Sequence, residues 1–515
     1  MSNLEFERIT VLPMDEYNQR LVANVHPENW VNPQPADCYD LVVIGAGTAG
    51  LVVAAGAAGL DLGLKVALIE KNLMGGDCLN VGCIPSKSLI RSARVIGEIW
   101  KAKDLGVHIS QLINVDFATV MSRLRRIRAG ISHHDSAARF KNLGVDVFLG
   151  NGKFASKNTI DVDGQILKFK KAVIATGARA IKPEIRGLET AGYLTNENVF
   201  SLIQKPEKLA VIGGGPIGCE LAQAFRRLGC EVTLFHNSSH ILNKEDREAA
   251  DILQRVFTDE GIRLVLNCQL EEVVTVTEGK RLYFSSHGNR DSVTVNEILI
   301  GAGRAPNVEG LNLEAVGVEY DQKVGVKVND YLQTTNSNIY AAGDICMNWK
   351  FTHAADAAAR IVIKNTLFSP FGLGRSQLSS LVMPWVTYTD PEIAHVGMYA
   401  DEAEKLGIEI ETIKIDFNNV DRAIADSQEA GFLKIHHKKG SDEIIGATIV
   451  ASHAGEMISE ITTAIVNKIG LSELSSVIHP YPTQAEAIKK AADAYRRTLL
   501  TPKTKKLLKF ITKLS

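Results

Sequence analysis

The sequence predicts an α/β protein with two Rossmann-like dinucleotide-binding units, followed by a C-terminal domain of alternating strands and helices. Two glycine fingerprints carry the first part of this prediction, because each lies between an apolar β-branched run and a helical pattern. One fingerprint alone is weak support, but two in one chain indicate two bound dinucleotides. The six glycines are Gly45, Gly47 and Gly50 in the first fingerprint and Gly213, Gly215 and Gly218 in the second.

The composition is that of a globular protein large enough for three or four domains. Of 515 residues, 45% are hydrophobic and 23% are charged. Basic and acidic residues nearly cancel, 57 against 59, which argues against a nucleic acid as partner. Seven cysteines are few and odd in number for this length, and residues 1–8 show no signal-peptide pattern. We therefore expect a reducing, cytoplasmic location.

The first unit begins near residue 38 and contains a stretch long enough to cross a membrane. Residues 41–60 carry no charge, and a transmembrane helix needs about 17–25 such residues. Five of these twenty residues are glycine, and a second strand-like run follows and ends at Glu70. We therefore predict a strand, a turn, a helix and a second strand, in which Glu70 binds a ribose hydroxyl of the dinucleotide.

Two cysteines with four residues between them, Cys78 and Cys83, follow this unit. On an ideal helix they would be separated by a rise of about 7.5 Å, beyond the usual Cα limit of about 6.8 Å for a disulfide. If they pair, the turn between them must be distorted, which Gly82 and Pro85 permit. A strained disulfide is easily reduced and could exchange electrons with a cofactor. The alternative is two buried, inert thiols.

The whole segment Gly75–Lys87 reads Gly-Gly-x-Cys-x-x-x-x-Cys-x-Pro-x-Lys. It resembles the redox-active segment of FAD-dependent pyridine nucleotide-disulfide oxidoreductases, the family of glutathione reductase, dihydrolipoyl dehydrogenase and mercuric reductase. The resemblance covers roughly residues 38–497 and implies a glutathione-reductase-like fold with a C-terminal α+β dimerisation domain. FAD would occupy the first fingerprint and a nicotinamide nucleotide the second, and no resident metal site is expected.

The resemblance also implies residue roles. Cys83 would face the flavin and form the charge-transfer thiolate, and Cys78 would attack the substrate. Lys87 matches the family lysine near the flavin, which pairs with a glutamate that here is Glu220. Three further elements match the family's FAD-contacting signatures. Their residues are Thr176 and Gly177 after one strand, Gly303 and Arg304 in Gly-Ala-Gly-Arg-Ala-Pro-Asn, and Asp344, which would contact the FAD ribityl chain.

Asp77 departs from the family, which usually has threonine beside the first cysteine. An acid at this position should raise the pKa of the Cys78 thiol and slow its attack at neutral pH.

The second dinucleotide is NADPH or NADH. His236 follows Gly213 by 23 residues, where an NAD enzyme usually has an acid for the ribose hydroxyls. The absence of an acid favours NADPH, because nothing repels a 2′-phosphate. No arginine stands in this loop, and the fingerprint ends in glycine, which favours NADH; between the two we expect NADPH.

The C-terminal motif, residues 478–486, places Tyr481 where the family usually has a histidine that pairs with a glutamate, here Glu486. Tyrosine is a poor base at neutral pH, but it can donate a hydrogen bond or contact a metal ion. Mercuric reductase also has tyrosine there, so the chain resembles that branch. His479 either replaces the missing base or packs beside Pro480. Against Hg(II) as substrate, the last cysteine is Cys346, whereas mercuric reductases carry a C-terminal cysteine pair.

We consider two basic segments as surface features. We expect the arginine-rich helical pattern of residues 120–139 to be solvated. From Arg496 to the C-terminus the chain has seven basic residues and no acidic one, with leucine and isoleucine on one helical face. This tail either packs on the protein's own body, which we favour, or makes peripheral contact with an anionic membrane surface.

The expected domains are consecutive along the chain. They are an N-terminal extension (1–37), the first part of the FAD domain (38–190), the NAD(P) domain (191–305), the second part of the FAD domain (306–378), the dimerisation domain (379–497) and a basic amphipathic tail (498–515).

The predicted function is a homodimeric FAD-dependent NAD(P)H oxidoreductase. Electrons would pass from the nicotinamide through FAD to Cys78 and Cys83 and on to a small disulfide, a metal ion or another oxidant. The activity would be mercuric-reductase-like or dihydrolipoyl-dehydrogenase-like. The alternatives are a transhydrogenase-like flavoprotein, which needs no cysteine pair, and a redox-sensing binding protein.

Overall fold

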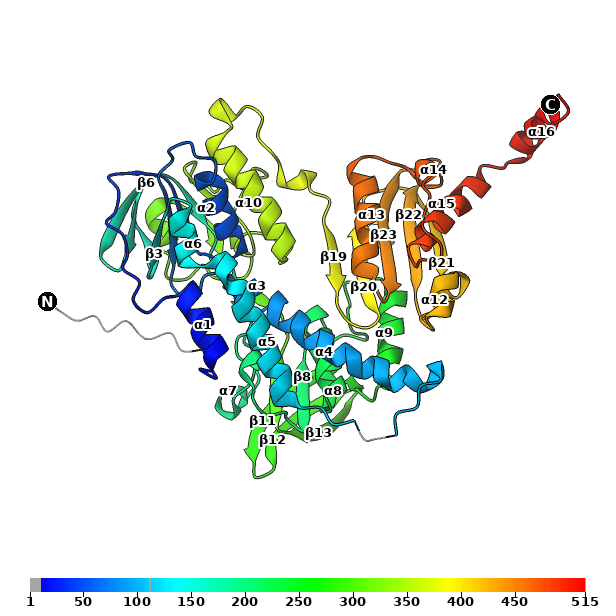
Figure 1. Ribbon diagram of the computed structural model, residues 1–515, viewed down its shortest axis with the longest axis horizontal. Coiled ribbons are helices and arrows are strands. Elements are labelled where there is room, and N and C mark those ends of the chain that lie inside the picture. The colour runs from blue at the N-terminus through cyan, green and yellow to red at the C-terminus, as the bar shows by residue number, and fades with distance from the viewer. Residues whose placement is uncertain (1–10, 111–112, 515) are drawn as a thin grey trace. The chain divides into compact units, whose positions relative to one another are not determined.

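The computed structural model describes residues 11–110 and 113–514, which form two compact units (Figure 1). The first unit comprises Met1–Gly213, Ala224–Phe235 and Cys268–Leu381. The second comprises Gly214–Gln223, His236–Asn267 and Val382–Ser515. Residues 1–10 of the expected N-terminal extension lie outside the described residues. The expected domain boundaries stay predictions.

A mixed sheet with the order β3-β2-β1-β6-β5-β4 is the centre of the first unit, and β18 pairs with β6. The strands β3, β2, β1, β6 and β18 are parallel, whereas β4, β5 and β6 form an antiparallel meander. The strands are β1 (Tyr39–Ile44), β2 (Val66–Glu70), β3 (Val145–Leu149), β4 (Gly152–Ser156), β5 (Thr159–Val162), β6 (Gln165–Ile174) and β18 (Ile339–Ala341).

The uncharged stretch of residues 41–60 is the expected strand, turn and helix, not a membrane span. Helix α2 (Thr48–Ala58) follows β1 and packs on β2 and on α10 (Thr352–Leu367) (Figure 1). Among the described residues, no helix is both long and apolar enough to cross a bilayer.

The other helices and sheets of the first unit surround this layer. The helices are α1 (Glu16–Val25), α3 (Gly76–Asn80), α4 (Cys83–Lys101), α5 (Phe117–Ile131), α6 (Ala137–Asn142) and α7 (Leu188–Ala191). The parallel strands are β9 (Glu231–Phe235), β8 (Lys208–Ile212) and β14 (Glu297–Ile300). The antiparallel pairings join β11 (Cys268–Val276), β12 (Gly279–Ser286) and β13 (Asn289–Val295); β7 (Ala178–Ala180) and β15 (Arg304–Pro306); and β16 (Tyr320–Asp321) and β17 (Gly325–Val326).

An antiparallel sheet with the order β19-β20-β23-β22-β21 forms the body of the second unit. Its strands are β19 (Pro384–Thr387), β20 (Glu392–Gly397), β21 (Ile410–Asp416), β22 (Phe432–Lys438) and β23 (Ile444–Ala451). Helices α13 (Ala454–Val466) and α15 (Glu486–Thr498) bury apolar side chains against it. The remaining elements are α9 (Arg247–Asp259), β10 (Arg263–Val265), α11 (Ala400–Lys405), α12 (Asp421–Ala425), α14 (Leu471–Leu474) and α16 (Pro502–Ile511). Helix α8 (Pro216–Arg227) has residues in both units.

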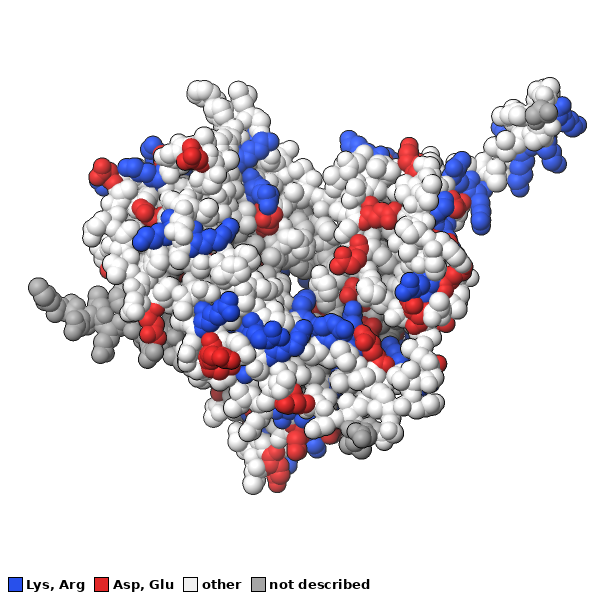
Figure 2. All heavy atoms as spheres, in the orientation of Figure 1, with Lys and Arg blue, Asp and Glu red and all other residues white. Residues whose placement is uncertain are grey.

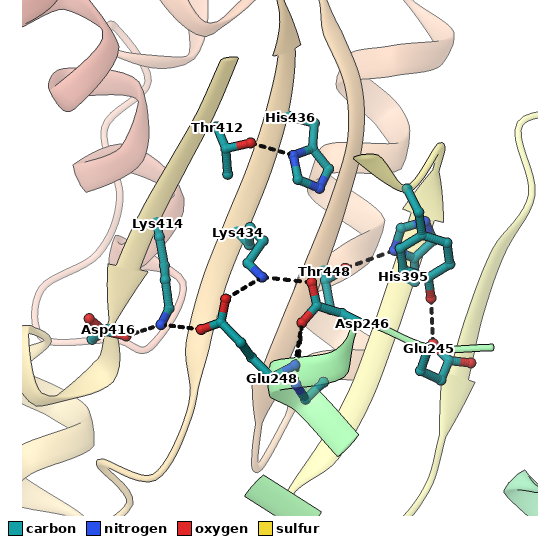
Figure 3. A network of polar contacts seen from close by, with 12 residues as sticks. Glu245, Asp246, Glu248, His395, Thr412, Lys414, Asp416, Lys434, His436 and Thr448 are labelled. Carbon is teal, nitrogen blue, oxygen red and sulfur yellow. Dashed lines mark hydrogen bonds and ion pairs between the residues drawn. The ribbon is translucent and has the colours of Figure 1, made fainter. Parts of the chain in front are cut away.

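A network of charges fixes the start of α9 to this sheet (Figure 3). Lys434 Nζ on β22 lies 2.6 Å from Asp246 Oδ2 and 2.8 Å from Glu248 Oε1. Lys414 on the neighbouring β21 also contacts Glu248, at 2.6 Å. The Asp246 carboxylate additionally accepts from the Ala249 amide and so caps α9. The Asp246 carboxylate therefore both caps the start of α9 and neutralises a lysine of the sheet.

The arginine-rich helix differs from expectation. Arg125 and Arg128 of α5 are buried, 6% and 3% exposed, not solvated. They bond to Asp15 and Asn18 at the start of α1, so part of the expected extension is a packed helix. The prediction of a solvated face was wrong for Arg125 and Arg128, because their partners lie 110 residues away in sequence.

The tail also differs from the reading we favoured. Helix α16 has no buried residue, so it does not pack on the protein's own body. Its lysines gather along one side of the helix (Figure 2), and Leu507, Phe510 and Leu514 are exposed.

Candidate active site

The cysteine segment is a broken helix. Helix α3 ends at Asn80 and α4 begins at Cys83, with Val81 and Gly82 in non-helical conformations between them. A Cβ atom on Gly82 would lie 2.7 Å from the Asp77 carbonyl oxygen, so only glycine fits there. The expected distortion between the cysteines is therefore present, and Gly82 permits it.

The two thiols lie side by side in the dithiol form. Both cysteines are thiols, and a hydrogen bond joins Cys78 to Cys83. Cys83 Sγ lies 3.3 Å from the hydroxyl of Thr352, the first residue of α10. The hydrogen bond with Cys83, burial and the Cys83 charge raise the pKa of Cys78, and Thr352 lowers it. Once one of the two thiols has ionised, loss of the proton from the other is disfavoured. The reduced pair therefore favours a state with one thiolate and one thiol.

Asp77 has a different role from the one expected. Its carboxylate forms an ion pair with Arg304, which also donates to the Ala178 carbonyl at 2.6 Å. The acid that raises the pKa of Cys78 is Asp135, from the turn after α5. Asp77 is not among the main groups that raise the pKa of Cys78, since the Arg304 guanidinium neutralises its charge. No local pattern in the sequence marks Asp135.

The first fingerprint has the geometry of a phosphate-binding turn. Gly45 has φ +102°, and a Cβ atom there would lie 2.4 Å from the Ala175 carbonyl oxygen. Gly50 lies even closer to the Gly45 carbonyl oxygen, so a Cβ atom there would overlap it. Gly47 precedes α2 and offers no side-chain cap, which leaves the first amides of α2 available to a phosphate.

Glu70 lies at the end of β2, as predicted. Its carboxylate accepts from the amides of Ala46 at 2.7 Å and Asn72 at 2.8 Å. Burial raises the pKa of Glu70, and these two hydrogen bonds lower it. The carboxylate is thus held beside the glycine turn, where a ribose hydroxyl would reach it.

Two further predicted FAD residues follow β6 and β18, neighbouring parallel strands of the same sheet as β1. Thr176 donates to the Asn307 carbonyl at 2.9 Å, and Gly177 has φ +68°. Asp344 follows β18, and its Oδ2 lies 3.4 Å from Arg304 Nε. Burial raises the pKa of Asp344, and Arg304 lowers it. Because carboxyl ends of parallel strands share one edge, these residues and the glycine turn fit an extended dinucleotide such as FAD.

Gly303 and Arg304 stand at β15. Gly303 has φ +119°, so a side chain there would be strained. Arg304 joins Asp77 of the cysteine segment to Asp344. The structure thus ties the predicted flavin-contacting aspartate to the redox turn through one guanidinium.

The second fingerprint is also a tight turn. Gly213 has φ +116°, and a Cβ atom there would lie 2.4 Å from the Gly301 carbonyl oxygen. A Cβ atom on Gly215 would meet no atom within 4 Å, which leaves space for a nucleotide, and Gly218 lies inside α8.

The His236 ring faces Gly214, the residue after Gly213 in the second fingerprint. Its Nδ1 accepts from the Gly214 amide at 3.1 Å, and its Nε2 is buried with no hydrogen-bond partner among the described residues. Burial lowers the pKa of His236, so the ring is neutral at pH 7. It therefore offers neither an acid for ribose hydroxyls nor a cation for a 2′-phosphate.

Lys87 lies on α4 and is partly buried, and Glu220 lies on α8. Glu220 Oε1 accepts from the Tyr388 amide at 2.9 Å. The pairing of Lys87 with Glu220 stays a prediction.

The tyrosine of the C-terminal motif is more exposed to solvent than the two cysteines. Tyr481 is 70% exposed and donates to Asp421 Oδ2 at 2.9 Å, a bond that raises the pKa of Tyr481. Glu486 begins α15, and its Oε2 is buried without a hydrogen-bond partner among the described residues. The His479 side chain is only 4% exposed and lies 2.9 Å from Glu460 Oε1. Whether His479 replaces the missing base or packs beside Pro480 stays a prediction.

Comparison with known proteins supports the same interpretation. A family model described as pyridine nucleotide-disulphide oxidoreductase matches residues 39–359, and the model of that family's dimerisation domain matches residues 383–492. A mercuric reductase of Lysinibacillus sphaericus is 33% identical over 456 residues, 88% of this chain and 82% of the relative. A dihydrolipoyl dehydrogenase of Chlamydia muridarum is 32% identical over 459 residues, 87% of this chain and 95% of the relative.

Two solved structures share the fold. The HOCl-induced flavoprotein disulfide reductase RclA from Escherichia coli superposes with a TM-score of 0.77 at 27% identity, covering 88% of this chain and 99% of RclA. LpdA from Mycobacterium tuberculosis gives a TM-score of 0.79 at 28% identity, covering 90% of this chain and all of LpdA. The predicted resemblance, fold class and enzyme class are confirmed: the chain belongs to the pyridine nucleotide-disulphide oxidoreductase family and has its glutathione-reductase-like fold with a dimerisation domain.

Proposed function

We propose that this protein is an FAD-dependent NAD(P)H oxidoreductase whose cysteine pair, Cys78 and Cys83, passes two electrons to a small oxidant. The observation that carries the proposal is the contact between the two thiols, with Cys83 against the hydroxyl of Thr352. Bound FAD would supply the two-electron relay between the nicotinamide and the disulfide. Reduction turns the disulfide into two thiols, and the acceptor takes the same two electrons when the disulfide re-forms.

The chain's own residues would support these steps. The Thr352 hydroxyl donates to a Cys83 thiolate and stabilises its charge. Cys78 carries the attacking sulfur in this scheme. Because burial and Cys83 raise its pKa, attack requires that its proton leave as the acceptor arrives.

The acceptor is a small disulfide, a metal ion or another oxidant. Among them we favour an oxidant that needs no proton from the enzyme. A disulfide acceptor releases a thiolate that requires protonation, and the histidine that would supply the proton is replaced by Tyr481. The names of the relatives fit this range, since they include mercuric reductases and the disulfide reductase RclA, whose structure is also known as a Cu(II) complex.

For the donor we favour NADPH over NADH. No acid stands at the end of β9 to repel a 2′-phosphate, because His236 takes that place. Since His236 is neutral, we expect the preference to be modest.

Anaerobic titration with NADPH, and separately with NADH, followed by the visible spectrum tests the electron path. We expect a long-wavelength charge-transfer band after two-electron reduction, with the preferred donor acting at lower concentration. Bleaching of the flavin without that band would instead support transhydrogenase or oxidase chemistry. A flavin that stays oxidised under excess NADPH and NADH would support the redox-sensing binding protein.

We propose a homodimer as the functional state, because the family's dimerisation-domain model matches residues 383–492. Sedimentation velocity of the FAD-loaded protein tests this, and a monomer would contradict it. The cytoplasmic location stays a proposal that rests on the cysteine content.

We also propose that α16 contacts an anionic membrane surface. Leu507 and Phe510 are exposed on this helix, which also carries several lysines, a composition that suits an interfacial helix. Co-sedimentation with vesicles of phosphatidylcholine and phosphatidylglycerol should pellet the full chain and lose a Leu507→Ser/Phe510→Ser variant. The matched control, Phe371→Ser/Leu373→Ser, removes two other exposed apolar side chains and should still pellet. Equal pelleting of both variants, or none of the wild type, would end the membrane proposal.

A further inference from the structure

A buried polar chain links the N-terminal helix to the turn between the two cysteines. Arg128 of α5 donates from Nη1 to the Asn80 carbonyl and from Nη2 to Asn18 Oδ1 of α1, each at 2.6 Å. Asn80 lies between Cys78 and Cys83 and is 5% exposed, and Asn18 is fully buried. One guanidinium thus holds a carbonyl of the redox turn and a side chain of the N-terminal helix.

Burial makes Arg128 dependent on these two oxygens. Its two hydrogen bonds go to neutral oxygens, its Nε has no hydrogen-bond partner among the described residues, and burial lowers the pKa of Arg128 to about 10. A buried charge needs well-placed acceptors, because each bond that is lost leaves a desolvated charge unpaired. Loss of Asn18 would therefore leave Arg128 held only by the Asn80 carbonyl.

The C-terminal end of α1 contacts the other end of the same segment. The Met74 amide donates to the Val25 carbonyl at 3.1 Å. His26 Nδ1 lies 2.6 Å from the Asn72 carbonyl oxygen. Residues 72–74 lead directly into the glycine pair that precedes Cys78.

Asn80 connects these two attachments. Its Nδ2 donates to the Met74 carbonyl at 3.0 Å and to the Gly76 carbonyl at 2.9 Å. A shift of Asn80 would therefore move the backbone on both sides of Cys78.

We propose that Asn18, Val25 and His26 position the redox site: they hold the segment 72–83, Asn18 through Arg128, and so set the contact between Cys78 and Cys83. These residues lie outside the matched family region, which begins at residue 39. The inference rests on the proposed function for its catalytic meaning, but the positioning itself can be measured without turnover.

The test uses the full-length, FAD-loaded protein with two substitutions at one position. Asn18→Ala removes the acceptor for Arg128, whereas Asn18→Asp keeps an oxygen at the same place. Asn24→Ala is the matched control, because Asn24 lies on the same helix and donates to Ser132 at 2.8 Å without contacting the redox segment. The readouts are the charge-transfer absorbance after two-electron reduction, kcat and KM, and the alkylation rate of Cys78 in the reduced protein by mass spectrometry.

For Asn18→Ala we expect about half the charge-transfer absorbance or less, and about a tenfold lower kcat at unchanged nucleotide KM, because small misplacements of reacting groups are costly. Alkylation of Cys78 should become about threefold faster or more, since the turn opens more often. Asn24→Ala should match the wild type, and Asn18→Asp, which keeps the acceptor for Arg128 but loses the bond from Nδ2 to the Pro13 carbonyl, should recover most of the loss.

Two outcomes would overturn the positioning role. The first is Asn18→Ala with wild-type absorbance and alkylation but a lower melting temperature, which would make α1 merely structural. The second is Asn24→Ala with the same losses as Asn18→Ala. If the wild type shows no charge-transfer band, the proposed electron path fails, but the alkylation rates still decide whether α1 holds the turn.

Discussion

The cysteine segment and the C-terminal motif, the two places where this chain departs from its family, are built differently. The segment around Cys78 is partly buried and bonded on several sides, by Thr352, Arg304 and Arg128. Tyr481 in the C-terminal motif is exposed and makes one bond, to Asp421. The comparison teaches that the dithiol site is assembled within one unit of one chain. The C-terminal motif, in contrast, leaves its tyrosine exposed.

The strongest test of this contrast is Cys83→Ser. Turnover with any acceptor should fall on the order of 10³-fold or more, and the charge-transfer band should vanish, because the serine hydroxyl cannot form the disulfide. Cys38→Ser, a change at another partly exposed free thiol of the same unit, should leave both unchanged. Normal turnover of Cys83→Ser would remove the cysteines from the mechanism and favour transhydrogenase chemistry.

His236→Glu should shift the ratio of kcat/KM for NADPH to that for NADH about tenfold toward NADH, which corresponds to about 1.4 kcal/mol. The new carboxylate would accept from ribose hydroxyls and repel a 2′-phosphate. Steady-state kinetics with both nucleotides measure the ratio. His240→Glu adds the same charge four residues away and serves as the control; an equal shift there would mean that position 236 does not face the ribose.

Tyr481→Phe should lower turnover by only about two- to tenfold and leave formation of the charge-transfer band by NADPH unchanged. Its raised pKa makes Tyr481 a poor base, so the loss should stay below the ~100-fold that marks general acid–base catalysis. Stopped-flow spectra separate the two half-reactions. Tyr320→Phe removes another surface hydroxyl bonded to a carboxylate and should have no effect. A loss above ~100-fold would place Tyr481 in the proton chemistry after all.

The smallest effect should come from Asp77→Thr, which restores the usual family residue. Because Arg304 neutralises Asp77, the pH dependence of Cys78 alkylation should hardly move. Asp135→Asn is the informative partner: Asp135 raises the pKa of Cys78, so its removal should lower that pKa and speed alkylation about two- to threefold at pH 8. A larger change in Cys78 alkylation for Asp77→Thr than for Asp135→Asn would show that Asp77 acts on the thiol directly.

Local sequence patterns predicted the parts of the molecule that depend on neighbours in the chain. The run of residues 41–70 forms β1, α2 and β2, because its glycines and β-branched residues act within a few positions. The broken helix at Gly82 follows from the same kind of local constraint.

Long-range pairing was not visible in those patterns. Arg304 reaches Asp77 across 227 positions, and Arg128 reaches Asn18 across 110. An arginine in a helical pattern has the same local signature whether it is solvated or buried. Asp135 was missed for the same reason, since only the fold brings it near Cys78.

The contact between Asn18 and Arg128 also constrains the order in which the nascent chain can fold. The N-terminal helix leaves the ribosome first, but the guanidinium that its asparagine binds follows 110 residues later. At about 5–20 residues per second this is a delay of roughly 5–20 s. During that interval the helix has no place to bury Leu21, Val22 and Val25, which are buried in the finished protein. The redox turn can therefore reach its final geometry only after the nascent chain has passed Arg128.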